Sequence, residues 1–136
     1  MSENEPTAGD PLVNRLGGIS YLHIPTDDPA RSAAFYHAVF GWNVRGEAAD
    51  LSFDDGSGHV IGAWVTDRPV ATDGGVLPYV FVESVDDTMA RVIAAGGSVD
   101  REPYAEGALW VTTFRDPAGS ACGAWQLGPR DPRVAG

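Results

Sequence analysis

The strongest constraint on the fold is that one order of structural signals occurs twice along the chain. In the first half, a β-branched and aromatic stretch at residues 19–24 precedes a helix signal and three short strand signals. After a link rich in Gly, Asp and Pro at residues 68–75, the same order begins again. Superposing Gly41 on Gly97 keeps the spacing of the two halves with little identity. We therefore expect an α+β fold made of two βαβββ modules.

The ends of both expected helices are marked in the sequence. Asp28 is a suitable N-cap, Pro29 suits the first helical position, and Gly41 suits the C-terminal stop. The second helix is expected from about Asp86 to the Gly96-Gly97 pair. The remaining strand candidates are residues 42–46, 51–54, 60–65, 76–82, 98–104, 108–115 and 121–127.

The length of 136 residues suits one core rather than two large independent domains. We expect a single domain over residues 15–127, with module one at 15–67 and module two at 74–127. The flanking segments 1–14 and 128–136 are expected to be flexible.

Composition excludes several classes of function. All nine basic residues are arginines, so Schiff-base lysines, a pyridoxal-phosphate anchor and a P-loop lysine are impossible. Cys122 is the single cysteine, which excludes thiolate-rich metal sites and an internal disulfide. A formal charge of −10 disfavours nucleic acid and makes a neutral or cationic ligand easier to accommodate than a polyanion. The segment 1–14 lacks the features of a signal peptide and no apolar run is long enough for a membrane, so we expect a cytoplasmic protein.

Two motifs resemble those of the vicinal oxygen chelate superfamily, which contains glyoxalases, bleomycin-resistance proteins and dioxygenases. They are the run at residues 23–36 with 39–42, and the run at 114–119 with 123–126. The resemblance implies that the two modules form an open, cup-shaped mixed sheet around a small-molecule ligand, and that the protein forms a homodimer.

In members of that superfamily that use a metal, the ligands lie on the first and last strands of each module. The matching positions here are Tyr21, Gly62, Leu77 and Gly123, and none of them is His, Glu or Gln. The resemblance therefore implies no metal site of the usual kind. We expect no cofactor, although a divalent metal held in an unconventional way stays open.

One set of candidate residues is catalytic. Strand alternation puts Tyr21 and His23 on one face, so His23 is a candidate acid–base residue with Tyr21 and Glu83 as partners. His59 is a further candidate, as a second ligand or proton carrier. The alternatives are a structural His23 and solvated positions for His59 and for the strand-end carboxylates of Asp54 and Glu83.

A second set is aromatic. The same alternation predicts that Trp64, Tyr79, Phe81 and Trp125 share the cup-facing side with Gly62, Leu77 and Gly123. Rings around positions without side chains suit a planar ligand, and the alternative is that the rings fill the core.

These features support three hypotheses of function. The first is a metal-independent protein of the bleomycin-resistance kind that binds an aromatic or cationic organic molecule through Tyr21, His23, His59 and the four rings, as in antibiotic resistance. The second is a lyase, isomerase or hydrolase of the same fold that uses His23. The third is a domain that serves dimerisation or regulation.

Overall fold

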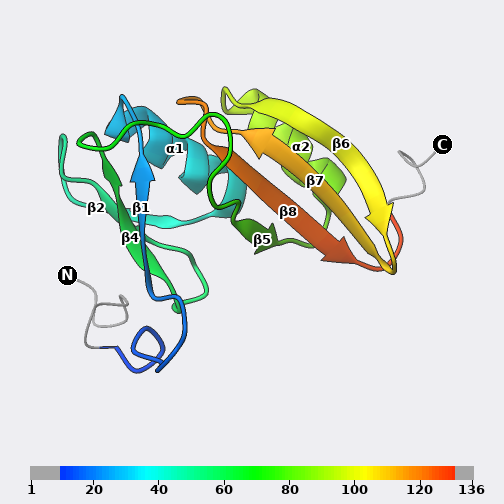
Figure 1. The fold of residues 1–136 in the computed structure, drawn as a ribbon, viewed down its shortest axis with the longest axis horizontal. Helices are drawn as coiled ribbons and strands as arrows, with labels where there is room; N and C mark the ends of the chain where they lie inside the picture. Colours follow the sequence, from blue (N-terminus) through cyan, green and yellow to red (C-terminus); the bar gives the residue numbers. More distant parts are fainter. Residues whose placement is uncertain (1–9, 131–136) are drawn as a thin grey trace. The chain divides into compact units, whose positions relative to one another are not determined.

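The computed structural model describes residues 10–130, and the chain divides into two compact units between Pro69 and Val70. Each unit is a βαβββ module with one helix and one four-stranded mixed sheet (Figure 1). The α+β fold class and the two modules expected from the sequence are therefore confirmed.

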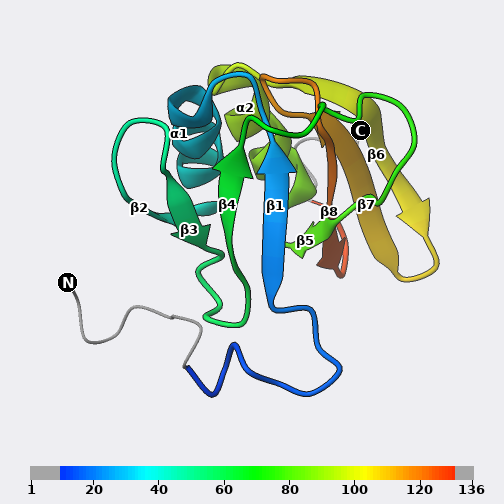
Figure 2. The same cartoon turned by 60° about the vertical axis from the view of Figure 1, so that its left-hand side comes forward.

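The first unit contains β1 (Tyr21–Pro25), α1 (Pro29–Phe40), β2 (Asn43–Arg45), β3 (Ser52–Asp54) and β4 (Ile61–Val65). Its sheet has the order β1-β4-β3-β2, in which β1 is parallel to β4 and the other pairs are antiparallel (Figure 2). The expected first strand at residues 19–24 thus begins two residues later and ends one residue later.

Helix α1 begins and ends where the sequence predicts. The Asp28 carboxylate accepts a hydrogen bond from the backbone nitrogen of Arg31 at 3.2 Å, and Pro29 occupies the first turn. Gly41 adopts a left-handed conformation with φ of 72°, and its nitrogen donates to the carbonyl of His37 at 2.9 Å. These local bonds fix the length of the helix.

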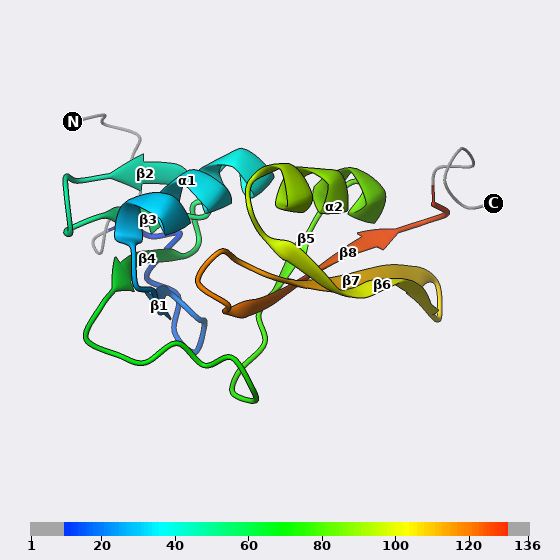
Figure 3. The same cartoon turned by 90° about the horizontal axis from the view of Figure 1, so that it is seen from above.

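The second unit contains β5 (Tyr79–Phe81), α2 (Val85–Ala94), β6 (Ser98–Glu106), β7 (Leu109–Arg115) and β8 (Ala121–Leu127). Its sheet has the order β5-β8-β7-β6, with β5 parallel to β8 and the other pairs antiparallel. Helix α2 packs on one face of this sheet, against β6, β7 and β8 (Figure 3). Strand β6 carries two register shifts, between Val99 and Arg101 and between Arg101 and Tyr104.

Each sheet has one face toward its helix and one face without a helix, which we call the helix-free face. In the first unit, the rings of Tyr36, Phe53 and Trp64 are buried between α1 and the sheet. In the second unit, Cys122 and Ala124 are buried on the helix side of β8. The helix-free faces carry exposed aromatic side chains, among them Tyr21, Tyr79 and Phe81.

The expected flexible segments fall largely on residues 1–9 and 131–136, which lie outside the described residues. The described part of the first segment is folded in a turn: the nitrogens of Val13 and Asn14 both donate to the carbonyl of Asp10. Val13 is buried, which differs from the expectation for a flexible segment. Between residues 10 and 130, no helix is long and apolar enough to cross a membrane.

Candidate functional site

Tyr21 and His23 lie together on the helix-free face of β1. Their rings meet edge to face, with centroids 5.2 Å apart, and Tyr21 is 51% exposed. In the parallel pairing of β1 with β4, Tyr21 lies beside Ile61 and His23 lies beside Ala63. Among residues 10–130, the His23 side chain has no hydrogen-bond partner, and its recorded contact in this unit is the Tyr21 ring. The predicted shared face of Tyr21 and His23 is thus present.

The predicted orientation of Trp64 and Gly62 is wrong. Trp64 pairs with Ile24 and Gly62 with Leu22, so both face the helix, and Trp64 is 2% exposed. Its ring packs 4.8 Å from that of Phe53, between centroids. A side chain at Gly62 would overlap the Phe53 ring and the carbonyl of Leu22, so this glycine permits core packing and opens no space for a ligand.

Trp64 and Gly62 were assigned to the wrong face because the prediction matched β4 of the first unit to β8 of the second with a shift of one residue. His23 lies five residues before the helix cap Asp28, and Tyr79 lies five residues before the cap Ser84. His23 pairs with Ala63, and Tyr79 pairs with Gly123. The position equivalent to Gly123 is therefore Ala63 rather than Gly62.

The other two predicted polar residues are separate from this pair. His59 is exposed in the bend before β4, where its backbone nitrogen donates to the Ser57 hydroxyl at 3.1 Å. Glu83 is exposed and directly precedes the Ser84 cap of α2. Within the first unit, the structure does not join His59 to His23.

The Asp54 carboxylate is buried and hydrogen-bonded, so its environment suits a structural role rather than that of a solvent-accessible general base. The side chain is 1% exposed and accepts hydrogen bonds from Arg45 Nη1 at 2.7 Å, Asn43 Nδ2 at 2.9 Å and the Gly56 nitrogen at 3.0 Å. Burial raises the pKa of this carboxyl, but the bonds and the Arg45 charge outweigh burial and hold the pKa below its ordinary value. Asp54 is thus a charged anchor for β2 and β3.

The positions that could hold a metal do not form a suitable donor set. On the paired first and last strands of each unit, the helix-free face presents Tyr21 and His23 opposite Ile61 and Ala63 in the first unit, and Tyr79 opposite Gly123 in the second. Within either unit these side chains are too few donors for a divalent cation. Over residues 10–130, no group of three or more His, Cys, Asp or Glu side chains is arranged to hold an ion.

The helix-free face of the second sheet carries a cluster of rings, which we call the aromatic face: Tyr79, Phe81, Tyr104 and Trp125. Tyr79 is 45% exposed and Phe81 is 55% exposed. The rings of Phe81 and Trp125 lie with centroids 4.7 Å apart. These exposed rings offer flat apolar surface to a ligand.

Gly123 determines how Tyr79 lies on this face. A Cβ atom at Gly123 would overlap ring atoms of Tyr79, so the ring lies directly over the glycine. Partial burial raises the pKa of Tyr79, and the neighbouring Tyr104 phenol and the Glu106 charge raise it further, whereas the Arg101 charge lowers it and is outweighed. The Tyr79 phenol is therefore a neutral group near pH 7.

Arg101 and Tyr104 are site residues that the sequence analysis missed. The guanidinium carbon of Arg101 lies 3.6 Å from the centroid of the Tyr104 ring. Residues three apart on a regular strand face opposite sides, but the register shift between them turns both to one face. Pro103 was the available signal, because proline inside a strand marks an edge or a bulge.

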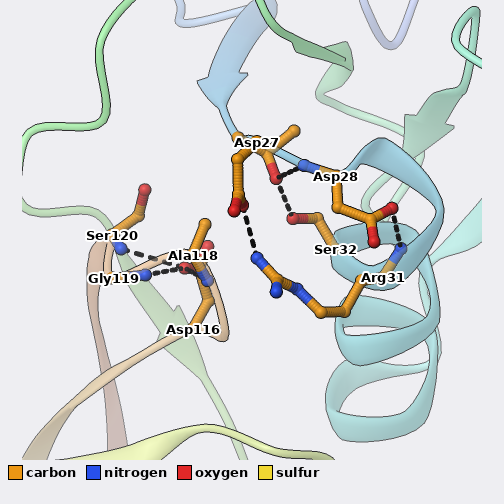
Figure 4. Close-up of polar contacts among 9 residues, drawn as sticks. Asp27, Asp28, Arg31, Ser32, Asp116, Ala118, Gly119 and Ser120 are labelled. Carbon is orange, nitrogen blue, oxygen red and sulfur yellow. Dashed lines mark hydrogen bonds and ion pairs between the residues drawn. The ribbon is translucent and has the colours of Figure 1, made fainter.

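Between the strands, the two family-like motifs form turns and helix caps. In the first, the Thr26 hydroxyl accepts from the Asp28 nitrogen and from the Ser32 hydroxyl, and Arg31 pairs with Asp27 (Figure 4). In the second, one oxygen of Asp116 accepts hydrogen bonds from the nitrogens of Ala118, Gly119 and Ser120 at 2.9–3.0 Å (Figure 4). These motifs therefore specify the fold more than the ligand.

Comparisons with known proteins agree with this fold. Residues 21–123 match the family model of a glyoxalase-like domain. The CFP32 protein of Mycobacterium tuberculosis is 28% identical over 122 residues, covering 82% of this chain and 46% of that protein. The chain thus spans about half the length of the curated relatives it matches.

Solved structures of the same fold include enzymes and binding proteins. A glyoxalase/bleomycin resistance protein/dioxygenase family enzyme from Burkholderia phytofirmans superposes with a TM-score of 0.68 at 20% identity, covering 79% of this chain and 97% of that one. TnmS3, an antibiotic binding protein from Streptomyces sp. CB03234, superposes with a TM-score of 0.64 at 19% identity, covering 82% and 96%. At these identities the likeness establishes the vicinal oxygen chelate fold alone.

Proposed function

We propose that this chain, which belongs to the glyoxalase-like domain family, binds a planar aromatic small molecule on the aromatic face of its second unit without using a divalent metal. The observation that carries the proposal is the exposed Phe81 ring packed on the half-buried Trp125 ring, beside the exposed Tyr79, whose ring lies over Gly123. An antibiotic binding protein of the same fold, TnmS3, supports a binding role.

The energetics favour a ligand that stacks. Exposed rings on a rigid sheet lose little conformational freedom on binding, and each stacked ring pair contributes about 0.5–1.5 kcal/mol beyond the burial of apolar area. Tyr79 and Tyr104 add hydroxyl groups at the edge of the apolar surface, where they can orient a polar substituent.

The competing enzymatic hypothesis depends on His23. General acid–base catalysis needs an imidazole within hydrogen-bond reach of the reacting proton and commonly a second group that orients the imidazole. In its own unit His23 contacts the Tyr21 ring, and its neighbour on β4 is Ala63. Binding is therefore the function that this geometry supports better.

The experiment titrates the protein with 9-anthracenemethanol, a neutral three-ring probe, by isothermal titration calorimetry with and without EDTA. We expect saturable binding that EDTA does not change. Phe81→Ala is expected to weaken it by about tenfold, because one stacked ring and its apolar area are lost.

Ile93→Ala is the matched control, since Ile93 is an exposed apolar side chain on α2 rather than on the aromatic face. It is expected to leave the affinity unchanged. Equal loss of affinity in both variants, or binding that requires added Zn²⁺ or Mg²⁺, would overturn the proposal.

A further inference from the structure

Arg101 differs in its surroundings from the arginines that form ion pairs in the described chain. Arg31, Arg45, Arg115 and Arg130 each lie within 4 Å of a carboxylate oxygen, but Arg101 stacks on a ring. Within residues 10–130, its N–H groups donate no hydrogen bond. In a chain with 19 acidic residues and nine basic ones, an arginine on a ring face with its donors unused is a candidate for ligand recognition.

The register of the second sheet relates Arg101 to the rings. Two rows of paired residues cross its four strands side by side on the helix-free face. One row is Tyr104, Val111, Trp125 and Phe81, and the other is Arg101, Thr113, Gly123 and Tyr79. Arg101 on β6 and Trp125 on β8 are therefore separated by one strand, β7. At the usual strand spacing, this corresponds to roughly 10 Å across the sheet.

Because Arg101 stacks on the Tyr104 ring, the N–H groups of its guanidinium remain available to a ligand. The face of the group lies against Tyr104, whereas its N–H donors point outward in the plane of the guanidinium. Those donors match the two oxygens of a carboxylate in a bidentate arrangement. The ring also limits the rotamers of the arginine, so less side-chain entropy is lost when an anion binds.

We propose that Arg101 is a specificity-determining residue that selects aromatic ligands carrying a carboxylate. The inference rests on the proposed function, since the aromatic body of the ligand lies on Phe81 and Trp125 while its carboxylate reaches Arg101. Because the Tyr79 phenol stays neutral, it adds no repelling charge. The Glu106 charge, which also acts on Tyr79, opposes an anion at this face, whereas the more distant acidic charges are screened beyond about 8 Å at physiological ionic strength.

The test compares three probes of one shape: 9-anthracenecarboxylate, neutral 9-anthracenemethanol and cationic 9-(aminomethyl)anthracene. Each is titrated by calorimetry into the wild-type chain, Arg101→Gln and Arg91→Gln. Arg91 is the control because it is exposed on α2, so that variant loses the same charge on the helix side.

We expect the wild-type chain and Arg91→Gln to bind the carboxylate about tenfold more tightly than the alcohol. Arg101→Gln is expected to lose this preference and to bind the carboxylate and the alcohol equally. Equal binding of the carboxylate and the alcohol by the wild-type chain, or a preference for the cation, overturns the role of Arg101 and leaves the proposed function intact. If none of the three probes binds, the proposed function itself fails.

Discussion

Replacing Asp54 by Asn is expected to destabilise the first unit and to do so in a pH-dependent way. The carboxylate is almost fully buried between β2 and β3, where it accepts three hydrogen bonds, one of them from Arg45 in an ion pair of 2.7 Å. An amide of the same shape has one acceptor oxygen, and its NH₂ group would face donors. The substitution therefore removes the charged acceptor of Arg45 and turns an NH₂ group toward its guanidinium.

The magnitude follows from these contacts. Hydrogen bonds to charged groups contribute about 1.5–3 kcal/mol, and breaking a buried ion pair costs about 3–5 kcal/mol. Since the Arg45 side chain is 23% exposed and Asn43 is exposed, both regain part of their hydration when the carboxylate is lost. We expect a loss of about 2–3 kcal/mol in the free energy of unfolding at pH 7.

The measurement is urea denaturation followed by tryptophan fluorescence, because Trp42 and Trp64 contact the neighbouring Phe53 in the same unit. The folded pKa of Asp54 lies below its unfolded value of about 3.9, so the stabilisation is fully present above that value. It is lost as the pH falls through the folded pKa. The difference between wild type and Asp54→Asn should therefore shrink below about pH 4.

Asp67→Asn is the control, since Asp67 is an exposed carboxylate in the same unit, and it should change stability by less than about 0.5 kcal/mol. The reasoning is refuted if Asp54→Asn behaves like this control at pH 7. It is also refuted if the gap between wild type and Asp54→Asn widens in acid.

Three further predictions concern the second unit. Gly123→Ala should displace the Tyr79 ring and lower the melting temperature, with a cost of about 1–3 kcal/mol, and it should weaken binding of the anthracene probes. Gln126→Met should cost about 1–3 kcal/mol in urea denaturation, because the buried Gln126 oxygen accepts from the Val85 nitrogen at 2.8 Å and Met offers no comparable acceptor. Cys122 should react with a disulfide reagent such as DTNB only after unfolding, since burial raises the pKa of its thiol to about 12; rapid reaction of the folded chain at pH 8 would contradict this.

The sequence predicted the parts of the fold that depend on local contacts. The bounds of α1 depend on the Asp28 cap and the Gly41 stop, each of which acts within one turn of helix. Strand β8 was predicted with its observed bounds, Ala121–Leu127, because the turn at Asp116 and Gly128 enclose it. The expected strand at residues 76–82 forms only at Tyr79–Phe81, where it pairs with β8.

The aromatic face could be predicted only in part because it depends on register, which is not a local property. Alternation correctly grouped Tyr79, Phe81 and Trp125, whose strands pair without a shift. It could not place Tyr104 beside Arg101, because the shift in β6 depends on the pairing with β7. The same limit explains Trp64, for which an error of one residue exchanges the two faces of the strand.

Gly62 and Gly123 illustrate why equal residues at matching strands can have different consequences. Gly62 faces α1, and the space above it is filled by the Phe53 ring, which is fully buried. Gly123 is on the helix-free face, and the ring above it is Tyr79, which remains 45% exposed. Both glycines let a ring approach the backbone of the sheet, so the type of residue is determined by packing in both cases. Whether that packing builds core or an exposed ring face depends on which side of its sheet the glycine faces, and a shift of one residue along the strand exchanges the two sides.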